Sequence, residues 1–267
     1  MLNDSTAKTA QKWGAMREFV KKHWKTVLFF AAVGLVGGFF VGLYSLESYP
    51  EEIKEEAYDQ GLNDVLVGII TAIQSAIYGI VLGALGIMLG KRTGLWRDEI
   101  TLTRKPLIIT SAVALIGGSV MILSDLLYFG KYLDAVMASY AVKPTFAYAV
   151  ATVTYGGVIE EVMLRLFMMS LIAFIIYLPF RRKYEKPTTI MLAAANVIAA
   201  LLFATGHIPA TEILIGLTPM SFFRCFFLNG GLGLLFGWLY RKYGLRYSML
   251  AHAGCHIVSK LIWILFV

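Results

Sequence analysis

Residues 65–89 read VLVGIITAIQSAIYGIVLGALGIML, a run of 25 residues without a charged side chain. A helix needs about 20 apolar residues to cross the hydrocarbon core of a bilayer. Only helices and closed barrels satisfy every backbone polar group in lipid, and this run lacks the alternation of a barrel strand. The stretch therefore predicts a membrane-spanning helix.

Six more stretches of the chain have a similar length and composition: 26–46, 107–129, 145–180, 189–207, 220–240 and 247–267. Only 15% of the 267 residues are charged and 58% are hydrophobic, whereas a soluble domain carries roughly a quarter charged residues. We therefore expect an all-α fold, a polytopic bundle of about seven transmembrane helices. The stretch 145–180 is too long for one simple span.

Charge alternates between the segments that join these spans. The segment before residue 26 and the loops near 91–105, 181–186 and 241–246 are basic, whereas the loop at 47–64 is acidic. Basic loops stay on the cytoplasmic side, so the pattern predicts a cytoplasmic N-terminus. The excess of 24 Lys and Arg over 17 Asp and Glu forms no stripe interleaved with aromatics, which argues against nucleic acid.

The N-terminal segment 1–25 is expected as a basic cytoplasmic or interfacial segment, followed by a transmembrane domain at 26–267. It forms either a mixed-charge helix on the membrane surface, anchored by Trp13 and Trp24, or a partly ordered tail. The apolar run after it is too long for a signal-peptide core, so we expect an uncleaved first span. These features favour a prokaryotic plasma membrane over an endoplasmic-reticulum-type membrane.

Small residues in the spans predict close packing inside the bundle. Gly34, Gly38 and Gly42 recur every four residues, as do Gly79 and Gly83, and such faces let two helices approach closely. We expect internal packing and not a dimer interface. The two cysteines lie in apolar stretches, which excludes a disulfide framework and predicts small packing residues.

Ionisable residues inside membrane spans are costly and usually functional. This chain places the following ones in or at the edge of its apolar stretches: Asp125, Glu160, Glu161, Arg165, His207, Arg224, His252, His256 and Lys260. Asp125 and Arg224 lie near span ends, where we expect them to extend toward the interface. Lys260 is deeper and has no predicted role.

The segment 156–165, GGVIEEVMLR, holds two of these carboxylates and an arginine. Glu161 and Arg165 lie one helical turn apart and can form an ion pair. Glu160 lies about 100° around the helix and is free to face a cavity, where a lone carboxylate can transfer protons. A purely structural Glu–Arg pair would explain Glu161 and Arg165 but not Glu160.

Three histidines complete the set. His207 closes the fifth span, and His252 and His256 lie four residues apart on one helical face, as metal-binding histidines do. Each signal is weak alone, since an interfacial or packed histidine is the commoner case. Carboxylates and three imidazoles in three apolar segments together match the ligands of Zn²⁺ with a glutamate-activated water.

These residues resemble the CAAX protease and bacteriocin-processing family, which includes the type II CAAX prenyl proteases. That family carries EExxxR, FxxxH and HxxxN or HxxxD in successive membrane helices. Here the motifs are Glu160-Glu161 with Arg165, Phe203 with His207, and His252 with His256, the last being a departure from Asn or Asp. The resemblance covers about residues 145–260.

The resemblance implies a helical intramembrane endopeptidase, either a metalloprotease or a glutamate protease, acting on a membrane-tethered protein or peptide substrate. Glu160, His207, His252 and His256 would be catalytic, with Glu161, Arg165 and Phe203 in support. Zn²⁺ would be held by Glu160, His207 and His252. In the prenyl proteases the substrate is a lipidated C-terminus from which three residues are removed. His256 would donate to an oxyanion, add a metal ligand, or mark a member without peptidase activity.

A count of residues raises one conflict. At 1.5 Å per residue, Glu160 and His207 lie about 30 Å from the basic loops, but His252 only about 10 Å from them. A shared site therefore predicts broken helices, with Gly156-Gly157 and Gly206 with Pro209 as candidate breaks.

Two alternatives to a protease stay open. One is a non-catalytic relative that acts as a membrane scaffold or regulator, which His256 would favour. The other is a proton-coupled transporter that uses Glu160 and the histidines as a relay. The chain lacks the two related halves that a transporter of that kind would show.

Overall fold

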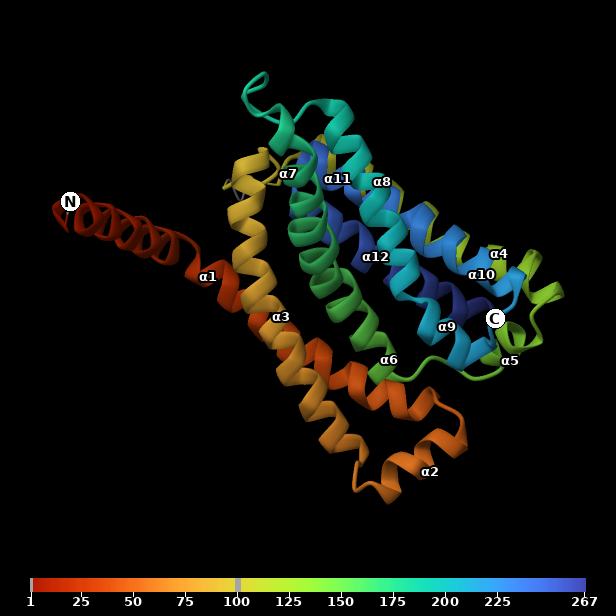
Figure 1. Cartoon of the computed structure of the whole chain (residues 1–267). Helices are drawn as coiled ribbons and strands as arrows, with labels where there is room; N and C mark the ends of the chain where they lie inside the picture. Colours follow the sequence, from red (N-terminus) through yellow and green to blue (C-terminus); the bar gives the residue numbers. More distant parts are fainter. Residues whose placement is uncertain (1, 99–101) are drawn as a thin grey trace.

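A computed structural model describes residues 2–98 and 102–267, and this part of the chain contains helices but no strand. Figure 1 shows a bundle of long helices with short helices at its ends. The elements are α1 (Leu2–Ser48), α2 (Glu51–Asp59), α3 (Asp64–Thr93), α4 (Arg104–Leu127), η1 (Phe129–Lys131), α5 (Asp134–Tyr140), α6 (Phe146–Ala151), η2 (Thr152–Glu160), η3 (Val162–Met169), α7 (Ser170–Tyr177), η4 (Leu178–Phe180), α8 (Thr189–Gly206), α9 (Ile208–Ile215), α10 (Pro219–Cys225), η5 (Phe226–Gly230), α11 (Gly231–Tyr243) and α12 (Leu245–Phe266).

The predicted all-α polytopic bundle is confirmed. The described residues contain 7 helical segments that are long and apolar enough to cross a membrane: Met16–Ser48, Asp64–Thr93, Arg104–Lys131, Phe146–Phe180, Thr189–Ile215, Pro219–Tyr243 and Leu245–Phe266. The chain is therefore an integral, multi-pass membrane protein. Its first span is not a separate element, because α1 continues without interruption from Leu2. The N-terminal part of α1 projects away from the bundle (Figure 1), and Trp13 and Trp24 are exposed on it.

The distribution of side chains suits a lipid environment. Large apolar residues cover the surface, for example Ile116, Ile190 and Leu265, whereas Glu161 and Arg165 are among the most deeply buried side chains. Charged residues are almost never fully buried unless they are paired, as Glu161 and Arg165 are. Polar groups therefore gather at the centre of this bundle, where they contact one another.

Glycines bring α1 and α3 into direct contact, as the sequence predicts. A Cβ atom at Gly34 or Gly38 would lie within 2.6 Å of Ser75, and one at Gly42 would lie within 2.7 Å of the Gly68 backbone. The helices can approach so closely only because these positions lack side chains. The predicted internal packing is confirmed, and both cysteines are buried and free.

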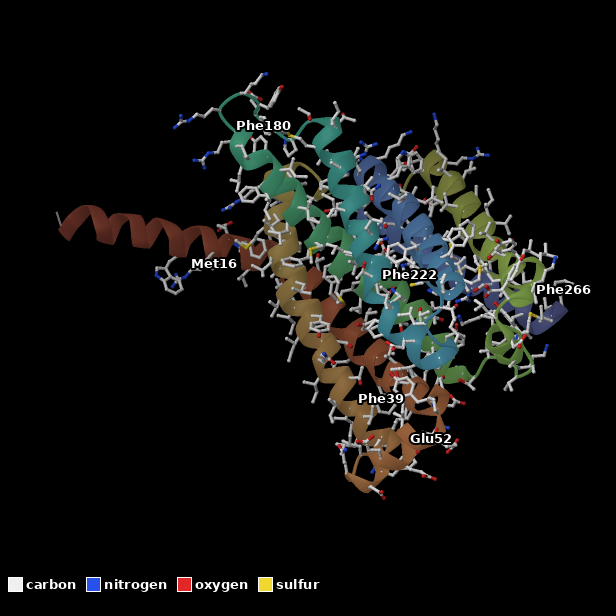
Figure 2. All side chains as sticks on the ribbon, turned by 45° about the vertical axis from the view of Figure 1, so that its right-hand side comes forward. Met16, Phe39, Glu52, Phe180, Phe222 and Phe266 are labelled. Carbon is white, nitrogen blue, oxygen red and sulfur yellow. The ribbon has the colours of Figure 1, made fainter. Side chains whose placement is uncertain are left out.

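The basic loops gather at one end of the bundle. The Arg97 side chain donates a hydrogen bond of 2.6 Å to the Lys242 carbonyl, and Arg241 donates one of 3.3 Å to the Thr189 carbonyl. Lys22 of α1 forms a 2.7 Å ion pair with Asp98 at the same end. Figure 2 shows Phe180 near this end and Glu52, on the acidic helix α2, at the opposite one.

The fourth span is continuous, so the predicted break at Gly156-Gly157 is wrong. The helix passes from α6 through η2 and η3 into α7, and both central segments are π-helical. A π-helix keeps every backbone group bonded, so the chain changes pitch without opening. The glycines instead permit close packing, because a Cβ atom at Gly157 would lie 2.6 Å from the Cβ of Ala253 on α12. The predicted break after Gly206 is confirmed, since α8 ends there and α9 starts at Ile208.

Unequal span ends account for about half of the roughly 20 Å conflict over depth. Ser170 of α7 contacts Tyr240 of α11 through their hydroxyl groups at 3.0 Å. Beyond that contact the fourth span continues to Phe180, whereas α11 ends at Tyr243. The fourth span has ten residues after Ser170, whereas α11 has three after Tyr240, and this difference corresponds to about 10 Å of helix. The two helices therefore do not end at one level, and the count from the loops overstated the separation of Glu160 from His252.

Candidate active site

Glu161 is the buried anchor of the site. Its side chain is fully enclosed, and its carboxylate accepts hydrogen bonds from Ser248 Oγ and from His252 Nδ1, the latter at 2.9 Å. The guanidinium of Arg165 lies 3.5 Å away, as the predicted pair one turn along the helix. The carboxylate oxygens are thus occupied by partners from η3 and α12, which leaves Glu161 little freedom to react.

Arg165 joins this anchor to two other helices. Its Nη2 donates a 3.1 Å hydrogen bond to the Gly233 carbonyl of α11. The guanidinium lies 4.7 Å from the ring centroid of Phe203 and 5.7 Å from that of Phe236. Such a planar cation stacks on aromatic faces and stays charged. Arg165 therefore fixes the positions of α8 and α11 around the site.

His252 is held in one orientation by Glu161 and Phe236. Its ring stacks on Phe236 with centroids 4.5 Å apart and an interplanar angle of 20°. Because the Nδ1 atom donates its hydrogen to Glu161, the other ring nitrogen, Nε2, faces the interior of the site. Ser248 lies one turn before His252 on α12, and neither Ser248 nor Phe236 was singled out from the sequence.

His207 is oriented in the same way by a different partner. Its Nδ1 atom lies 2.9 Å from the Phe203 carbonyl, one turn earlier on α8. A carbonyl can only accept, so Nδ1 carries the hydrogen and Nε2 is the free nitrogen. The ring packs edge-on against Phe203 at 4.6 Å. Phe203 thus positions both the histidine that follows it and the arginine behind it.

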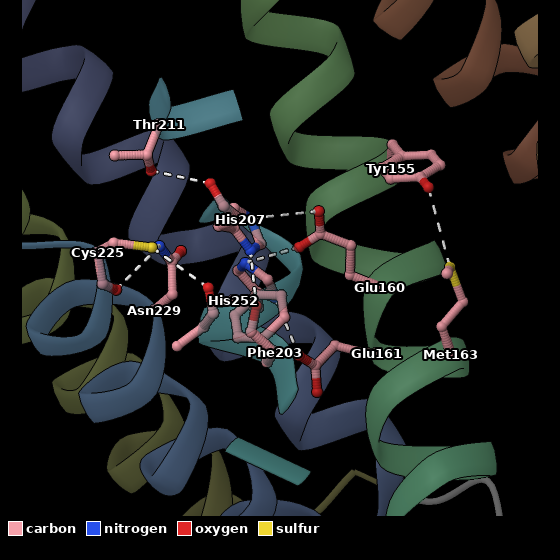
Figure 3. Close-up of polar contacts among 11 residues, drawn as sticks. Tyr155, Glu160, Glu161, Met163, Phe203, His207, Thr211, Cys225, Asn229 and His252 are labelled. Carbon is pink, nitrogen blue, oxygen red and sulfur yellow. Dashed lines mark hydrogen bonds and ion pairs between the residues drawn. The ribbon is translucent and has the colours of Figure 1, made fainter. Parts of the chain in front are cut away.

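Glu160 faces the free imidazole nitrogens of His207 and His252 (Figure 3). Its Oε1 is 4.0 Å from His207 Nε2, and its Oε2 is 3.8 Å from His252 Nε2. Both distances exceed a direct hydrogen bond and leave a small polar space at the ends of these side chains. The Glu160 side chain is 18% exposed, whereas that of Glu161 is fully buried. The two neighbouring carboxylates therefore have different surroundings, one open and one enclosed.

His256 extends the polar row by one turn of α12. Its ring stacks on that of His252 with centroids 5.1 Å apart. A Cβ atom at Gly156 would lie 3.1 Å from His256 Nε2, so the imidazole rests against the fourth span. Its Nδ1 atom is buried and has no hydrogen-bond partner among the described residues.

The predicted zinc ion would have Glu160, His207 and His252 as its ligands. Glu160, His207 and His252 have suitable donor atoms, and His252 has an outer carboxylate partner, as metal-binding histidines do. Ligands at about 2.1 Å from a tetrahedral ion lie about 3.4 Å apart, less than the 3.8 and 4.0 Å observed. Over the described ranges no group of three or more such side chains has the spacing of a metal site. The donor atoms of these side chains suit zinc, but their spacing is about 0.4–0.6 Å wider than a bound ion would require.

The prediction for Asp125 and Arg224 is wrong in its geometry. Asp125 is only 1% exposed and does not extend to the interface. Arg224 binds it through two hydrogen bonds of 2.6 Å, and the Tyr140 hydroxyl donates a third of 2.8 Å. The pair links α4 to α10, because an uncompensated charge in lipid is too costly to leave alone.

The fold and the site together define a class of helical membrane protein. Its spans enclose one anchored carboxylate, Glu161, and one partly open carboxylate, Glu160, which faces two oriented imidazoles. Residues 142–258 match the family described as Type II CAAX prenyl endopeptidase, Rce1-like. This match confirms the resemblance that the three motifs indicate and extends over η2, η3, α8 and most of α12. At the level of that family, the activity is that of an intramembrane peptidase. No curated protein and no solved structure gives a match.

Proposed function

We propose that this protein is an intramembrane endopeptidase that hydrolyses a peptide bond of a membrane-tethered substrate, with Glu160 as the residue that activates water. One observation supports this proposal. Glu160 Oε1 lies 4.0 Å from His207 Nε2 and Glu160 Oε2 lies 3.8 Å from His252 Nε2, and both imidazoles have a fixed orientation. A water between them has an acceptor on the carboxylate and two further polar partners. A prenylated C-terminal segment, as the name of the matched family suggests, is the substrate we propose.

In the first step, the water oxygen bonds to the scissile carbonyl carbon, and Glu160 takes one proton from that water. The carbonyl π-electrons move to oxygen and produce a tetrahedral oxyanion. When both imidazoles are neutral, Glu160, Glu161 and Arg165 together carry one net negative charge. One further proton makes these groups neutral overall. Held on His252 Nε2 or His207 Nε2, that proton would stabilise the oxyanion by a charge-assisted hydrogen bond.

In the second step, the carbon–nitrogen bond breaks and the protonated Glu160 gives its proton to the leaving amine. The carboxylate is thereby restored, and the products are a carboxylic acid and an amine, as hydrolysis requires. General acid–base transfer of this kind contributes about 10²–10⁴ in rate. His256 stacks behind His252 and offers a second donor to the oxyanion.

Zinc stays a separate proposal for the same residues, with Glu160, His207 and His252 as ligands after a small closure. It is supported by the Glu161 partner on His252 Nδ1, which is the outer hydrogen bond that metal-binding histidines make. When bound, zinc would polarise the carbonyl and the water. Metal content of the purified protein, beside His252→Ala, tests it: about one zinc per chain, lost in the variant, supports this form.

The central experiment measures cleavage of a farnesylated peptide by purified protein in lipid nanodiscs. We expect Glu160→Gln to lower kcat by about 10²-fold or more, since the amide cannot accept the proton from water. The matched control is Glu55→Gln on the exposed acidic helix α2, which we expect to leave the rate unchanged. Equal rates for Glu160→Gln and wild type would refute the proposal. No cleavage by wild type would instead favour a non-catalytic scaffold.

A further inference from the structure

Lys260 is a buried cation that the proposed chemistry does not use. It lies on α12 and is only 6% exposed. Its Nζ atom lies 4.1 Å from the ring centroid of Tyr148, on the first turn of the fourth span. In the described part of the chain, no carboxylate or carbonyl accepts a hydrogen bond from it. A lysine in a membrane span is rare without a partner, which calls for an explanation.

The buried carboxylate of Asp125, on α4, cannot serve as that partner. Asp125 is already bound by two Arg224 nitrogens and by the Tyr140 hydroxyl. Tyr140 and Tyr148 both pack edge-on against Trp263, with centroids at 4.8 and 6.2 Å. The Asp125–Arg224 pair is therefore neutralised internally, and Lys260 has no counter-ion among the described residues. An anionic ligand beside Lys260 would supply one.

A row of nitrogen-bearing side chains connects Lys260 to Glu160. His252, His256 and Lys260 recur every four residues on α12 and face the antiparallel fourth span. His252 faces Glu160, His256 rests against Gly156, and Lys260 covers Tyr148. Within the described ranges the buried Nδ1 of His256 has no hydrogen-bond partner, so two successive groups of the row are unpaired there.

The length of this row fits a short peptide. The eight helical steps from His252 to Lys260 span about 12 Å along the helix. An extended peptide covers about 3.3–3.6 Å per residue, so the same distance corresponds to three or four residues. A chain end held at Lys260 would therefore place the third or fourth peptide bond from the end beside Glu160.

The geometry points to Lys260 as the binding site for the free C-terminal carboxylate of the substrate. The ammonium supplies the missing counter-charge, and His256 donates to the substrate backbone between the two sites. Lys260 thereby sets the distance from chain end to cleaved bond. This inference rests on the proposed endopeptidase activity and adds to it a required substrate feature, a free α-carboxylate.

The test compares a farnesylated peptide that ends in a C-a-a-X sequence as the free acid with the same peptide as the C-terminal amide. A third peptide, an amide with Glu as its last residue, distinguishes a side-chain carboxylate from the α-carboxylate. We expect wild type to cleave the acid with a kcat/KM on the order of tenfold or more above that of both amides. Lys260→Met should bring the ratio of acid to amide toward one, and Lys260→Arg should retain a preference for the acid.

The matched control is Lys143→Met, because the exposed Lys143 donates to the Trp263 and Ile264 carbonyls at the end of α12. Its ratio of acid to amide should equal that of wild type. If wild type cleaves acid and amide equally, the carboxylate site is refuted while the endopeptidase stands. If the Glu-ended amide equals the acid, the α-carboxylate is refuted as the ligand. If wild type cleaves none of the peptides, the proposed function fails and this site with it.

Discussion

Two adjacent glutamates in one helix have opposite surroundings. Glu161 is enclosed by Ser248, His252 and Arg165, whereas Glu160 faces two imidazole nitrogens without touching either. An enclosed carboxylate with fixed partners suits the positioning of other groups, and a partly open one suits proton transfer. The pair thus divides structure and chemistry between neighbouring residues.

This division predicts different effects on stability. Glu161→Gln leaves the Arg165 charge buried without its counter-ion, so we expect a loss of about 3 kcal/mol in the free energy of unfolding. Glu160→Gln should change that free energy by less than about 0.5 kcal/mol, as substitutions without close contacts do. Unfolding of both variants in mixed micelles measures the difference. Equal destabilisation by the two substitutions would contradict the assignment of Glu161 as the anchor.

At the scale of the helix, the contact between the fourth span and α12 depends on Gly157. A Cβ atom there would lie 2.6 Å from the Cβ and 2.8 Å from the Cα of Ala253. We expect Gly157→Leu to force the helices apart, separate Glu160 from His252 and lower kcat by at least about tenfold. Peptide cleavage and the midpoint of thermal unfolding measure the effect.

The control for that substitution is Gly231→Ala on α11, where no atom lies within 4 Å of the added Cβ. Alanine also favours a helix by about 1 kcal/mol over glycine. Gly231→Ala should therefore fold at least as well as wild type. A Gly157→Leu variant as active as the control would show that the close approach is not needed.

The sequence predicts helices better than it predicts their internal geometry. The seven spans follow from apolar run length, and the pairing of Glu161 with Arg165 follows from their spacing. The π-helical winding of η2 and η3 does not, because an apolar run of this length fits hydrogen bonds from residue i to either i+4 or i+5. The Gly156-Gly157 break was predicted for the same reason, since spacing cannot distinguish a gap in a helix from a close contact.

Other parts of the site needed tertiary structure. The positions of Ser248 and Phe236 beside Glu161 and His252 depend on how α11 and α12 cross the fourth span, which no local pattern contains. A signal did exist for Ser248, since it lies one turn before His252 on the same face. The pairing of Asp125 with Arg224 joins residues 99 positions apart and was likewise invisible to spacing.

For the molecule as a whole, the Asp125–Arg224 pair joins α4 to α10. Arg224→Met leaves Asp125 buried and unpaired, and we expect a loss of about 3–5 kcal/mol in the free energy of unfolding. The double variant Asp125→Leu with Arg224→Met removes both charges and should recover most of that loss. A double-mutant cycle on unfolding in micelles measures the coupling. Additive effects would contradict a direct contribution of the pair.

The gathering of basic loops at one end predicts the orientation of the whole protein. We propose that this end faces the cytoplasm, because Lys and Arg are retained on that side. In a variant without Cys225 and Cys255, a cysteine at Lys183→Cys should react with a membrane-impermeant reagent only from the cytoplasmic side. A cysteine at Glu55→Cys should react only from the other side. The reverse pattern would invert the topology.

The unequal ends of α7 and α11 have a consequence for the surrounding lipid. Beyond the contact of Ser170 with Tyr240, the fourth span extends about 10 Å further than its neighbour. The adjoining leaflet must thin beside the α11–α12 turn and thicken beside α7, at a modest free-energy cost for each ångström of mismatch. Lipids with shorter acyl chains relieve the first deformation and longer ones the second. We therefore expect the thickness of the host membrane to influence the tilt of α12, and through it the spacing of His252 and Glu160.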